Sequence, residues 1–206
     1  MRSINVNMGK GRLEAFSDGV IAIIITIMVL EMKVPEHGHF QLADLKSLGA
    51  VFISYVISFV YVGIYWNNHH HMFHAVRSIN GSVLWANLHL LFWLSVVPFV
   101  SAWMGENSFG AIWPVVMYGF VLLMNSIAYG ILVGVLVKHE GKNSALAAAV
   151  GNDKKGKIST FLYVLGIACA WLSTYLSLAF YILVALIWLV PDRRIEEKLA
   201  AEQSSN

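Results

Sequence analysis

Long apolar segments alternate with short polar segments along the whole chain. A helix needs roughly 17–25 apolar residues to cross a hydrocarbon core of about 30 Å, and most of these segments are that long or longer. The last one, residues 158–190, would span about 50 Å as one straight helix, so we expect a break near Ser173 to Ser177. The pattern predicts membrane-spanning helices at residues 14–34, 45–73, 82–103, 111–137, 158–173 and 176–190.

The composition agrees with an all-α, polytopic membrane protein. Of the 206 residues, 58% are hydrophobic and only 13% are charged, whereas soluble domains contain about 25% charged residues. We therefore expect a single six-helix transmembrane domain over residues 1–206, with a further short helix over Ser144 to Val150 in the polar segment before the last two spans. The first apolar segment is too long for a cleavable signal peptide and should remain in the protein.

The basic residues fall almost entirely on one side of this predicted bundle. Of the 14 lysines and arginines, all except Lys33 and Lys46 lie on the side that holds both termini. Lysine and arginine concentrate on the cytoplasmic side of membrane proteins. The charge distribution therefore predicts a multi-pass protein of the cell membrane, with both termini in the cytoplasm and residues 191–206 as a cytoplasmic tail.

Ser17 and Asp18 lie where the first apolar segment begins, near the expected membrane boundary. Serine and aspartate are good helix caps because they accept hydrogen bonds from free backbone N–H groups, and negative charge suits a helix N-terminus. A carboxylate at this depth can instead bond to other helices, as ionisable residues in membranes usually do. The sequence leaves both interpretations open, a cap and a polar network.

Ile23, Ile27 and Leu30 form an apolar stripe on the first predicted helix, because they follow the i, i+4, i+7 spacing. Thr26 lies at the edge of this stripe. Such a stripe is typical of a packing seam between helices. It can also line a pore, because rings of branched aliphatic side chains close a pore by expelling water, and nearby hydroxyls replace part of an ion's hydration shell.

Four histidines cluster at the end of the second predicted helix: His69, His70, His71 and His74. His70 and His74 share a helix face, which is the spacing of a two-histidine metal pair. A catalytic zinc takes about three protein ligands, and Asp18 or His89 could supply the third. The motif H-E-x-x-H is absent, so we favour interfacial or hydrogen-bonded histidines and expect no metal site.

The head of the first helix carries the pattern R-x-x-x-F-S-D, formed by Arg12, Phe16, Ser17 and Asp18. Further polar and aromatic positions follow in the next two helices: Trp66, His69-His70, Phe73, Asn87-Leu88 and Pro98-Phe99. Together these residues resemble the transmembrane-protein-175 family of potassium channels, in its short prokaryotic form. The resemblance covers residues 12–103.

The resemblance implies a homotetramer in which helix 1 of each subunit lines a central pore. Ile23, Ile27 and Leu30 would form the constriction, and Thr26 would contribute to selectivity along the ion pathway. Position 27 is isoleucine where relatives often have leucine, which preserves an apolar ring. The resemblance also implies a structural network, and its members would be Arg12, Phe16, Ser17, Asp18, Trp66, Asn87 and either His69 or His70.

These observations predict a potassium-selective, leak-type channel for monovalent cations in the lipid bilayer, and not an enzyme. It would need no cofactor beyond the permeant K⁺ ion and would bind no nucleic acid. The sequence T-V-G-Y-G is absent, which excludes the carbonyl cage of common potassium channels. The alternatives are a proton- or cation-coupled secondary transporter, or an intramembrane metal-dependent enzyme built on residues 69–74. The interiors of helices 2–6 hold no Asp, Glu, Lys or Arg, which disfavours coupled transport.

Overall fold

The computed structural model describes residues 9–32, 42–141, 143–151 and 153–189. All regular secondary structure in these ranges is helical, which confirms the all-α fold class. The helices are α1 (Lys10–Leu30), α2 (Leu42–His74), α3 (Gly81–Glu106), α4 (Ile112–Glu140), α5 (Ala145–Val150), α6 (Lys154–Cys169) and α7 (Thr174–Leu189).

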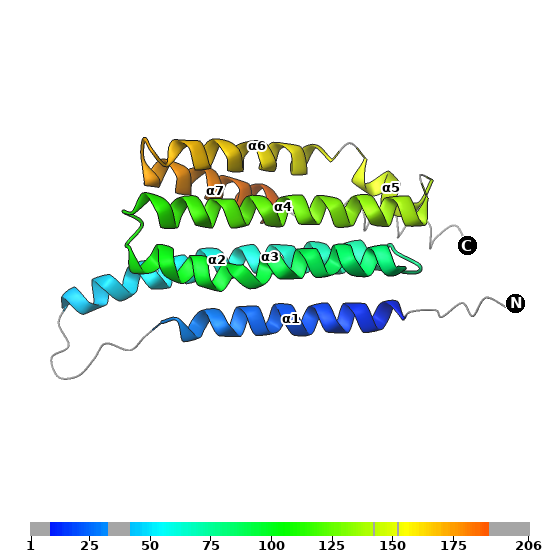
Figure 1. Ribbon diagram of the computed structural model, residues 1–206, viewed down its shortest axis with the longest axis horizontal. Helices are drawn as coiled ribbons and strands as arrows, with labels where there is room; N and C mark the ends of the chain where they lie inside the picture. The colour runs from blue at the N-terminus through cyan, green and yellow to red at the C-terminus, as the bar shows by residue number, and fades with distance from the viewer. Residues whose placement is uncertain (1–8, 33–41, 142, 152, 190–206) are drawn as a thin grey trace, which may run out of the picture.

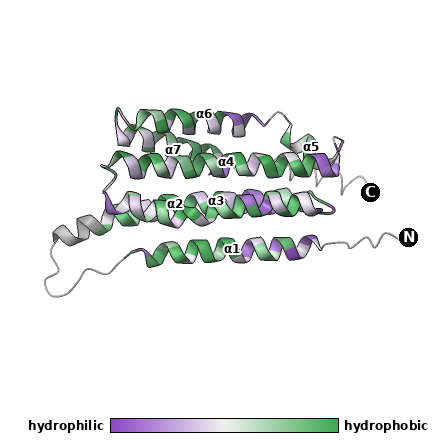
Figure 2. Ribbon diagram, viewed as in Figure 1, coloured by the Kyte–Doolittle hydropathy of each residue, from purple (hydrophilic) through white to green (hydrophobic). Residues whose placement is uncertain are grey.

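Four of the described helices are long and apolar enough to cross a membrane: α1, the Leu48–His74 part of α2, α3 and α4. α7 is a shorter apolar helix of 16 residues, and it packs against α6, which has the same length. Apolar residues predominate along these helices (Figure 2), and many large apolar side chains are exposed. An apolar surface of this extent suits lipid and not water, so the protein is a multi-pass membrane protein.

Figure 1 shows α1 along one edge of an elongated bundle, with α2 and α3 beside it, then α4, and α6 with α7 along the opposite edge. α1 packs mainly on α3 and α2, whereas α3 packs against α4, and α4 packs against α6. The side of α1 that is turned away from α2 and α3 is therefore left uncovered by the described parts of the chain.

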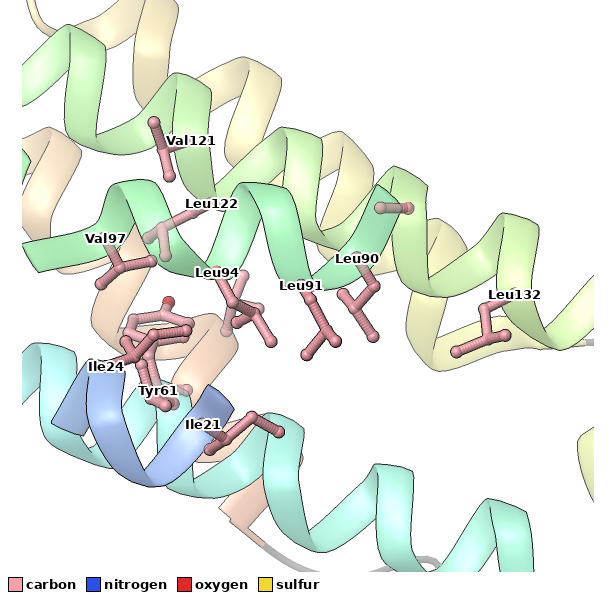
Figure 3. Close-up of a cluster of buried hydrophobic side chains, with 14 of the residues drawn as sticks. Ile21, Ile24, Tyr61, Leu90, Leu91, Leu94, Val97, Val121, Leu122 and Leu132 are labelled. Atoms are coloured by element: carbon pink, nitrogen blue, oxygen red, sulfur yellow. The ribbon is translucent and has the colours of Figure 1, made fainter. Parts of the chain in front are cut away.

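α3 provides the centre of the apolar core. Half of its span is buried, compared with 22–33% of the other three long spans. The residues labelled in Figure 3 join α1, α2, α3 and α4 in one cluster: Ile21, Ile24, Tyr61, Leu90, Leu91, Leu94, Val97, Val121, Leu122 and Leu132. Helices in lipid associate through close packing and polar contacts, because lipid tails are as apolar as leucine. Ile21 and Ile24 of α1 are therefore part of the buried cluster that α3 centres.

One end of the bundle brings together the start of α1, the end of α2, the start of α3 and the end of α4, and we call it the N-terminal end. Glu140 Oε1 accepts hydrogen bonds from the backbone N–H groups of Arg77 (3.0 Å) and Ser78 (3.2 Å). His139 bonds to the side chains of Ser78 and Asn80. The end of α4 thus holds the connection between α2 and α3 in place.

The bounds of α1 differ from the sequence prediction of residues 14–34. The helix begins at Lys10 after the N-cap Gly9, and it ends at Leu30 with Glu31 as C-cap. Asp18 therefore lies past the second turn of the helix, where backbone N–H groups already have intrahelical partners. The interpretation of Ser17 and Asp18 as helix caps is wrong for this reason.

The last apolar segment forms two helices, as predicted, but the break falls at residues 170–173. α6 begins at Lys154 and not at residue 158, because Asp153 caps it by accepting a hydrogen bond from the Gly156 N–H (3.1 Å). The expected short helix also forms, with Ser144 accepting a bond from the Ala147 N–H. The predicted tail, residues 191–206, lies outside the described residues.

Candidate functional site

α1 has two faces in different surroundings. The buried face holds residues that pack on α2 and α3: Leu13, Ser17, Ile21, Ile24 and Met28. The uncovered face holds the predicted constriction residues, and Ile23, Ile27 and Leu30 are 58%, 42% and 75% exposed. At 100° per residue, the centres of the two faces lie roughly 120° apart. The structure therefore places the whole predicted constriction away from the core of the chain.

Ile23 and Ile27 line an open groove between α1 and α3 that has a volume of about 470 Å³. The remaining lining comes from both helices: Val20, Ile24, Glu31, Ser95, Pro98, Phe99 and Ala102. The walls are mainly apolar, and Phe99 is 64% exposed at one side. The groove is therefore a surface of the bundle on which another apolar element can pack.

Thr26 is exposed, and its hydroxyl bonds to its own helix. Thr26 Oγ1 donates to Ile23 O at 2.9 Å, with Ala22 O at 3.1 Å as a second acceptor. A hydroxyl has one hydrogen and two lone pairs. Because the hydrogen is turned toward the helix backbone, the oxygen lone pairs face outward and are available to a cation.

A chain of hydrogen bonds ties the buried face of α1 to α3 and α2. The Ser17 hydroxyl donates to Leu13 O within α1 (2.8 Å) and accepts from the Asn87 amide of α3 (2.9 Å). Asn87 Oδ1 in turn bonds to His69 Nε2 of α2 (2.8 Å). Since Asn87 Oδ1 can only accept, His69 Nε2 must carry the hydrogen. We call Ser17, His69 and Asn87 the polar anchor.

The polar anchor is fully inside the protein. Ser17, His69 and Asn87 are each no more than 1% exposed. The polar atoms along this chain have protein partners and no access to water, and a buried donor or acceptor that loses its partner destabilises the fold by about 1–3 kcal/mol. The anchor therefore fixes the rotation of α1 about its own axis, and with it the direction in which Ile23 and Ile27 point.

Asp18 contacts α2 through a separate bond. Trp66 Nε1 donates to Asp18 Oδ1 at 2.9 Å. The indole also stacks on the His70 ring, with centroids 6.0 Å apart and an interplanar angle of 23°. Ser17 and Asp18 thus contact different helices, α3 and α2, and α1 is braced from two directions.

The other signature residues lie outside the polar anchor. Phe16 is 52% exposed, and it lines a groove of about 450 Å³ together with Arg12 and the α3 residues Leu84 and Leu88. His70 does not reach Asn87, because its Nε2 bonds to His74 Nε2 instead. His69 is therefore the histidine that contacts Asn87, which the sequence left open. His69 shares a helix face with Val62 and Phe73, which are both fully buried, and this burial is visible only in the structure.

Sequence reasoning missed a second polar cluster, toward the opposite end of the bundle. Ser101 Oγ of α3 bonds to the hydroxyls of Ser58 (2.8 Å) and Ser54 (3.0 Å) of α2. Ser58 also bonds to Tyr118 of α4 at 2.9 Å. The i, i+4 spacing of Ser54 and Ser58 was the available signal, because it places both on one helix face. This serine cluster joins α2, α3 and α4.

Among the described residues, no group of three or more His, Cys, Asp or Glu side chains could hold a metal ion. The two candidate third ligands have other partners. Asp18 accepts the bond from Trp66, and His89 Nε2 accepts from Trp93 Nε1 at 3.0 Å. The geometry in this part of the chain therefore gives no three-ligand catalytic centre.

Comparisons with known proteins agree with this helical architecture. The family model described as "Endosomal/lysosomal potassium channel TMEM175" matches residues 12–98, which include most of α1, all of α2 and most of α3. The chain is 56% identical over 192 residues to a protein named as a potassium channel of Chryseobacterium sp. (strain P1-3). That match covers 93% of this chain and 98% of the relative.

A crystal structure of a lysosomal potassium-selective channel TMEM175 homolog from Chamaesiphon minutus is similar to this chain with a TM-score of 0.75 and 28% identity. It covers 89% of this chain and 97% of that one. A shorter match, 37% identical over 84 residues, is to the endosomal/lysosomal proton channel TMEM175 of Rattus norvegicus, covering 36% of this chain and 17% of the rat protein.

The class of protein that these comparisons define is a membrane ion channel and not an enzyme. The chain belongs to the TMEM175 family.

Proposed function

We propose that the chain forms a potassium-selective, leak-type pore on the axis of a homotetramer, with α1 of each subunit lining the pore. One observation carries the proposal: Ile23, Ile27 and Leu30 are exposed on a helix whose other face is buried and hydrogen-bonded. The names of the Chryseobacterium and Chamaesiphon relatives support K⁺ as the permeant ion.

Four copies of the uncovered face would surround an axis with apolar rings. Ile23, Ile27 and Leu30 lie on successive turns, so each position forms one ring of four side chains. Water and ions are expelled from a narrow apolar constriction unless it widens. Such rings limit the pore to a small leak of monovalent cations, without any coupling ion.

Thr26 supplies the polar group beside these rings. Its hydroxyl hydrogen is bonded to Ile23 O, so its oxygen is oriented as an acceptor. Four such oxygens could replace part of the hydration shell of a passing cation. This gives Thr26 the role of a selectivity residue in the proposal.

The proposed topology has α1, α2, α3, α4, α6 and α7 as six spans of a single domain over residues 1–206, in the cell membrane. The N-terminal end of the bundle would face the cytoplasm together with both termini. Lys10, Arg12, Arg77, Lys138 and Lys154 belong to this side, which agrees with the preference of basic residues for the cytoplasmic face.

The experiment that tests the proposal is ion flux from liposomes that contain the purified protein. Outward K⁺ and Na⁺ gradients are compared, with no other ion gradient present. We expect passive K⁺ release that exceeds Na⁺ release. Equal rates for both ions, or release that requires a second ion gradient, would contradict a potassium-selective leak.

Proton conduction through the same pore is a second candidate, because the rat relative is named as a proton channel. It is measured in the same liposomes with an internal pH-sensitive dye and a K⁺ ionophore to balance charge. Proton entry is measured with the ionophore present, and K⁺ release through the pore is measured without it. A proton flux larger than the K⁺ flux would assign the pore to protons.

A further inference from the structure

His70 and His74 form an exposed pair in the last two turns of α2. Their Nε2 atoms lie 3.1 Å apart, and their rings meet edge to face with centroids 4.5 Å apart and an interplanar angle of 78°. In this arrangement one Nε2 donates its hydrogen and the other accepts it. Both reactive nitrogens therefore point at one shared position beside the helix.

The separation of these nitrogens matches the spacing of two ligands on one metal ion. Imidazole binds Zn²⁺ at about 2.0–2.1 Å, so two such bonds that meet at about 90–110° place their nitrogens roughly 2.8–3.4 Å apart. The 3.1 Å separation lies inside this range. A metal ion would lie off the line between the two nitrogens, so both rings would turn to direct their lone pairs at it. The hydrogen on one Nε2 would move to the Nδ1 of the same ring, because a metal-binding nitrogen carries no hydrogen.

We infer that His70 and His74 bind one divalent transition-metal ion, of the class that prefers imidazole, such as Zn²⁺ or Ni²⁺. The remaining positions on the ion would be filled by water, because both rings are exposed. This two-ligand site differs from the three-ligand catalytic centre considered from the sequence. It does not rest on the proposed pore.

Two contacts of Trp66 connect the site to α1. The His70 ring stacks on Trp66, and Trp66 donates its indole hydrogen to Asp18. An ion that holds His70 in one rotamer also holds the surface on which Trp66 packs. Metal binding would therefore stabilise the brace between α2 and α1, and should raise the melting temperature of the protein.

The test measures Zn²⁺ binding to the full-length protein in detergent, with any purification tag removed, by competition with a chromophoric chelator. We expect about one ion for each chain. Loss of an outer-shell partner alone weakens metal sites about 10–100-fold, so His74→Ala, which removes a ligand, should weaken binding at least tenfold. His70→Ala should do the same.

His71→Ala is the matched control, because His71 lies between the two proposed ligands in the same turns of α2. We expect its Zn²⁺ affinity to stay within about twofold of the parent, since its nitrogens are not part of the pair. Equal weakening in His71→Ala and His74→Ala would overturn the assignment, and so would unchanged binding in His74→Ala.

A second variant separates loss of the ligand from a disturbed helix end. His74→Cys retains a side chain that binds Zn²⁺, so it should recover most of the affinity that His74→Ala loses. Failure of the cysteine variant to bind Zn²⁺, in protein whose circular dichroism spectrum matches the parent, would contradict the proposed site.

Discussion

The two faces of α1 have similar apolar composition but opposite environments. Ile23 is 58% exposed, whereas its neighbour Ile24 is 4% exposed. Ile24 lies on the same face as Ser17, which bonds to Asn87 of α3, and Ile23 lies on a face with no buried polar contact. The difference teaches that a few polar bonds determine which apolar face of this helix is turned toward protein.

The largest expected effect comes from the isoleucine pair. Ile24→Ala leaves a cavity between α1 and α3 and should lower the free energy of unfolding by about 2–4 kcal/mol, as for other buried truncations. Ile23→Ala removes a side chain from the uncovered face and should lower it by less than about 1 kcal/mol. Reversible unfolding in mixed micelles measures both. A larger loss for Ile23→Ala would reverse our assignment of the two faces.

Asn87→Ala should destabilise the protein by about 1–3 kcal/mol. It leaves the buried His69 Nε2–H without its acceptor, whereas Ser17 Oγ loses one donor and keeps its bond to Leu13 O. Asn107→Ala is the matched control near the other end of α3. Asn107 is exposed, and its side-chain amide donates to Trp103 O of its own helix, so we expect a loss of about 0.5 kcal/mol or less. Similar losses for the two variants would show that the polar anchor contributes no more than a surface bond.

Trp66→Phe removes the donor to Asp18 and retains an aromatic ring beside His70. The bond is exposed, so we expect a loss of about 0.5–1.5 kcal/mol in unfolding free energy. Trp85→Phe, at a position that is 75% exposed on α3, serves as the control and should change stability by less than about 0.5 kcal/mol. If Trp66→Phe is as stable as the control, then the Trp66–Asp18 bond does not stabilise the contact between α1 and α2.

Thr26→Val should have the smallest effect on stability, because the hydroxyl bonds only to its own helix. Its expected effect is on selectivity. Each lost acceptor contributes about 0.5–1.5 kcal/mol. The proposed tetramer loses four of them, so the ratio of K⁺ to Na⁺ flux should decrease by at least about twofold to tenfold. Thr26→Ser keeps the oxygen and should keep the ratio. If valine and serine give the same ratio as threonine, then Thr26 does not contact the ion.

The sequence predicted the helices well because long apolar segments have few alternatives in a membrane. It misplaced α1 by several residues, since Ser17 and Asp18 resemble caps and only their bonds to α3 and α2 reveal otherwise. Local hydrogen bonds determine where a helix begins and ends. The Asp153 carboxylate caps α6, and the helix therefore begins four residues before the start that hydropathy predicted.

The members of the polar contacts could be named from the sequence, but their pairing could not. His69 and His70 are adjacent and chemically identical, and only the packing of α2 turns His69 toward Asn87. The serine cluster could not be predicted because single serines are common in membrane helices. Only the structure shows that Ser58 of α2 bonds to Ser101 of α3. The proposed role of the uncovered face requires further copies of the chain around one axis, and hydropathy along a single chain carries no signal for contacts between copies.

The central claim is that the uncovered face of α1 lines the pore, and K⁺ flux through the isoleucine variants tests it most directly. Ile23→Ala and Ile24→Ala are reconstituted into liposomes as verified assemblies, at equal protein content. We expect K⁺ release to increase in Ile23→Ala, because a smaller side chain widens and wets the constriction. Release from Ile24→Ala should match the parent. Unchanged flux in Ile23→Ala, or an increase confined to Ile24→Ala, would contradict the claim.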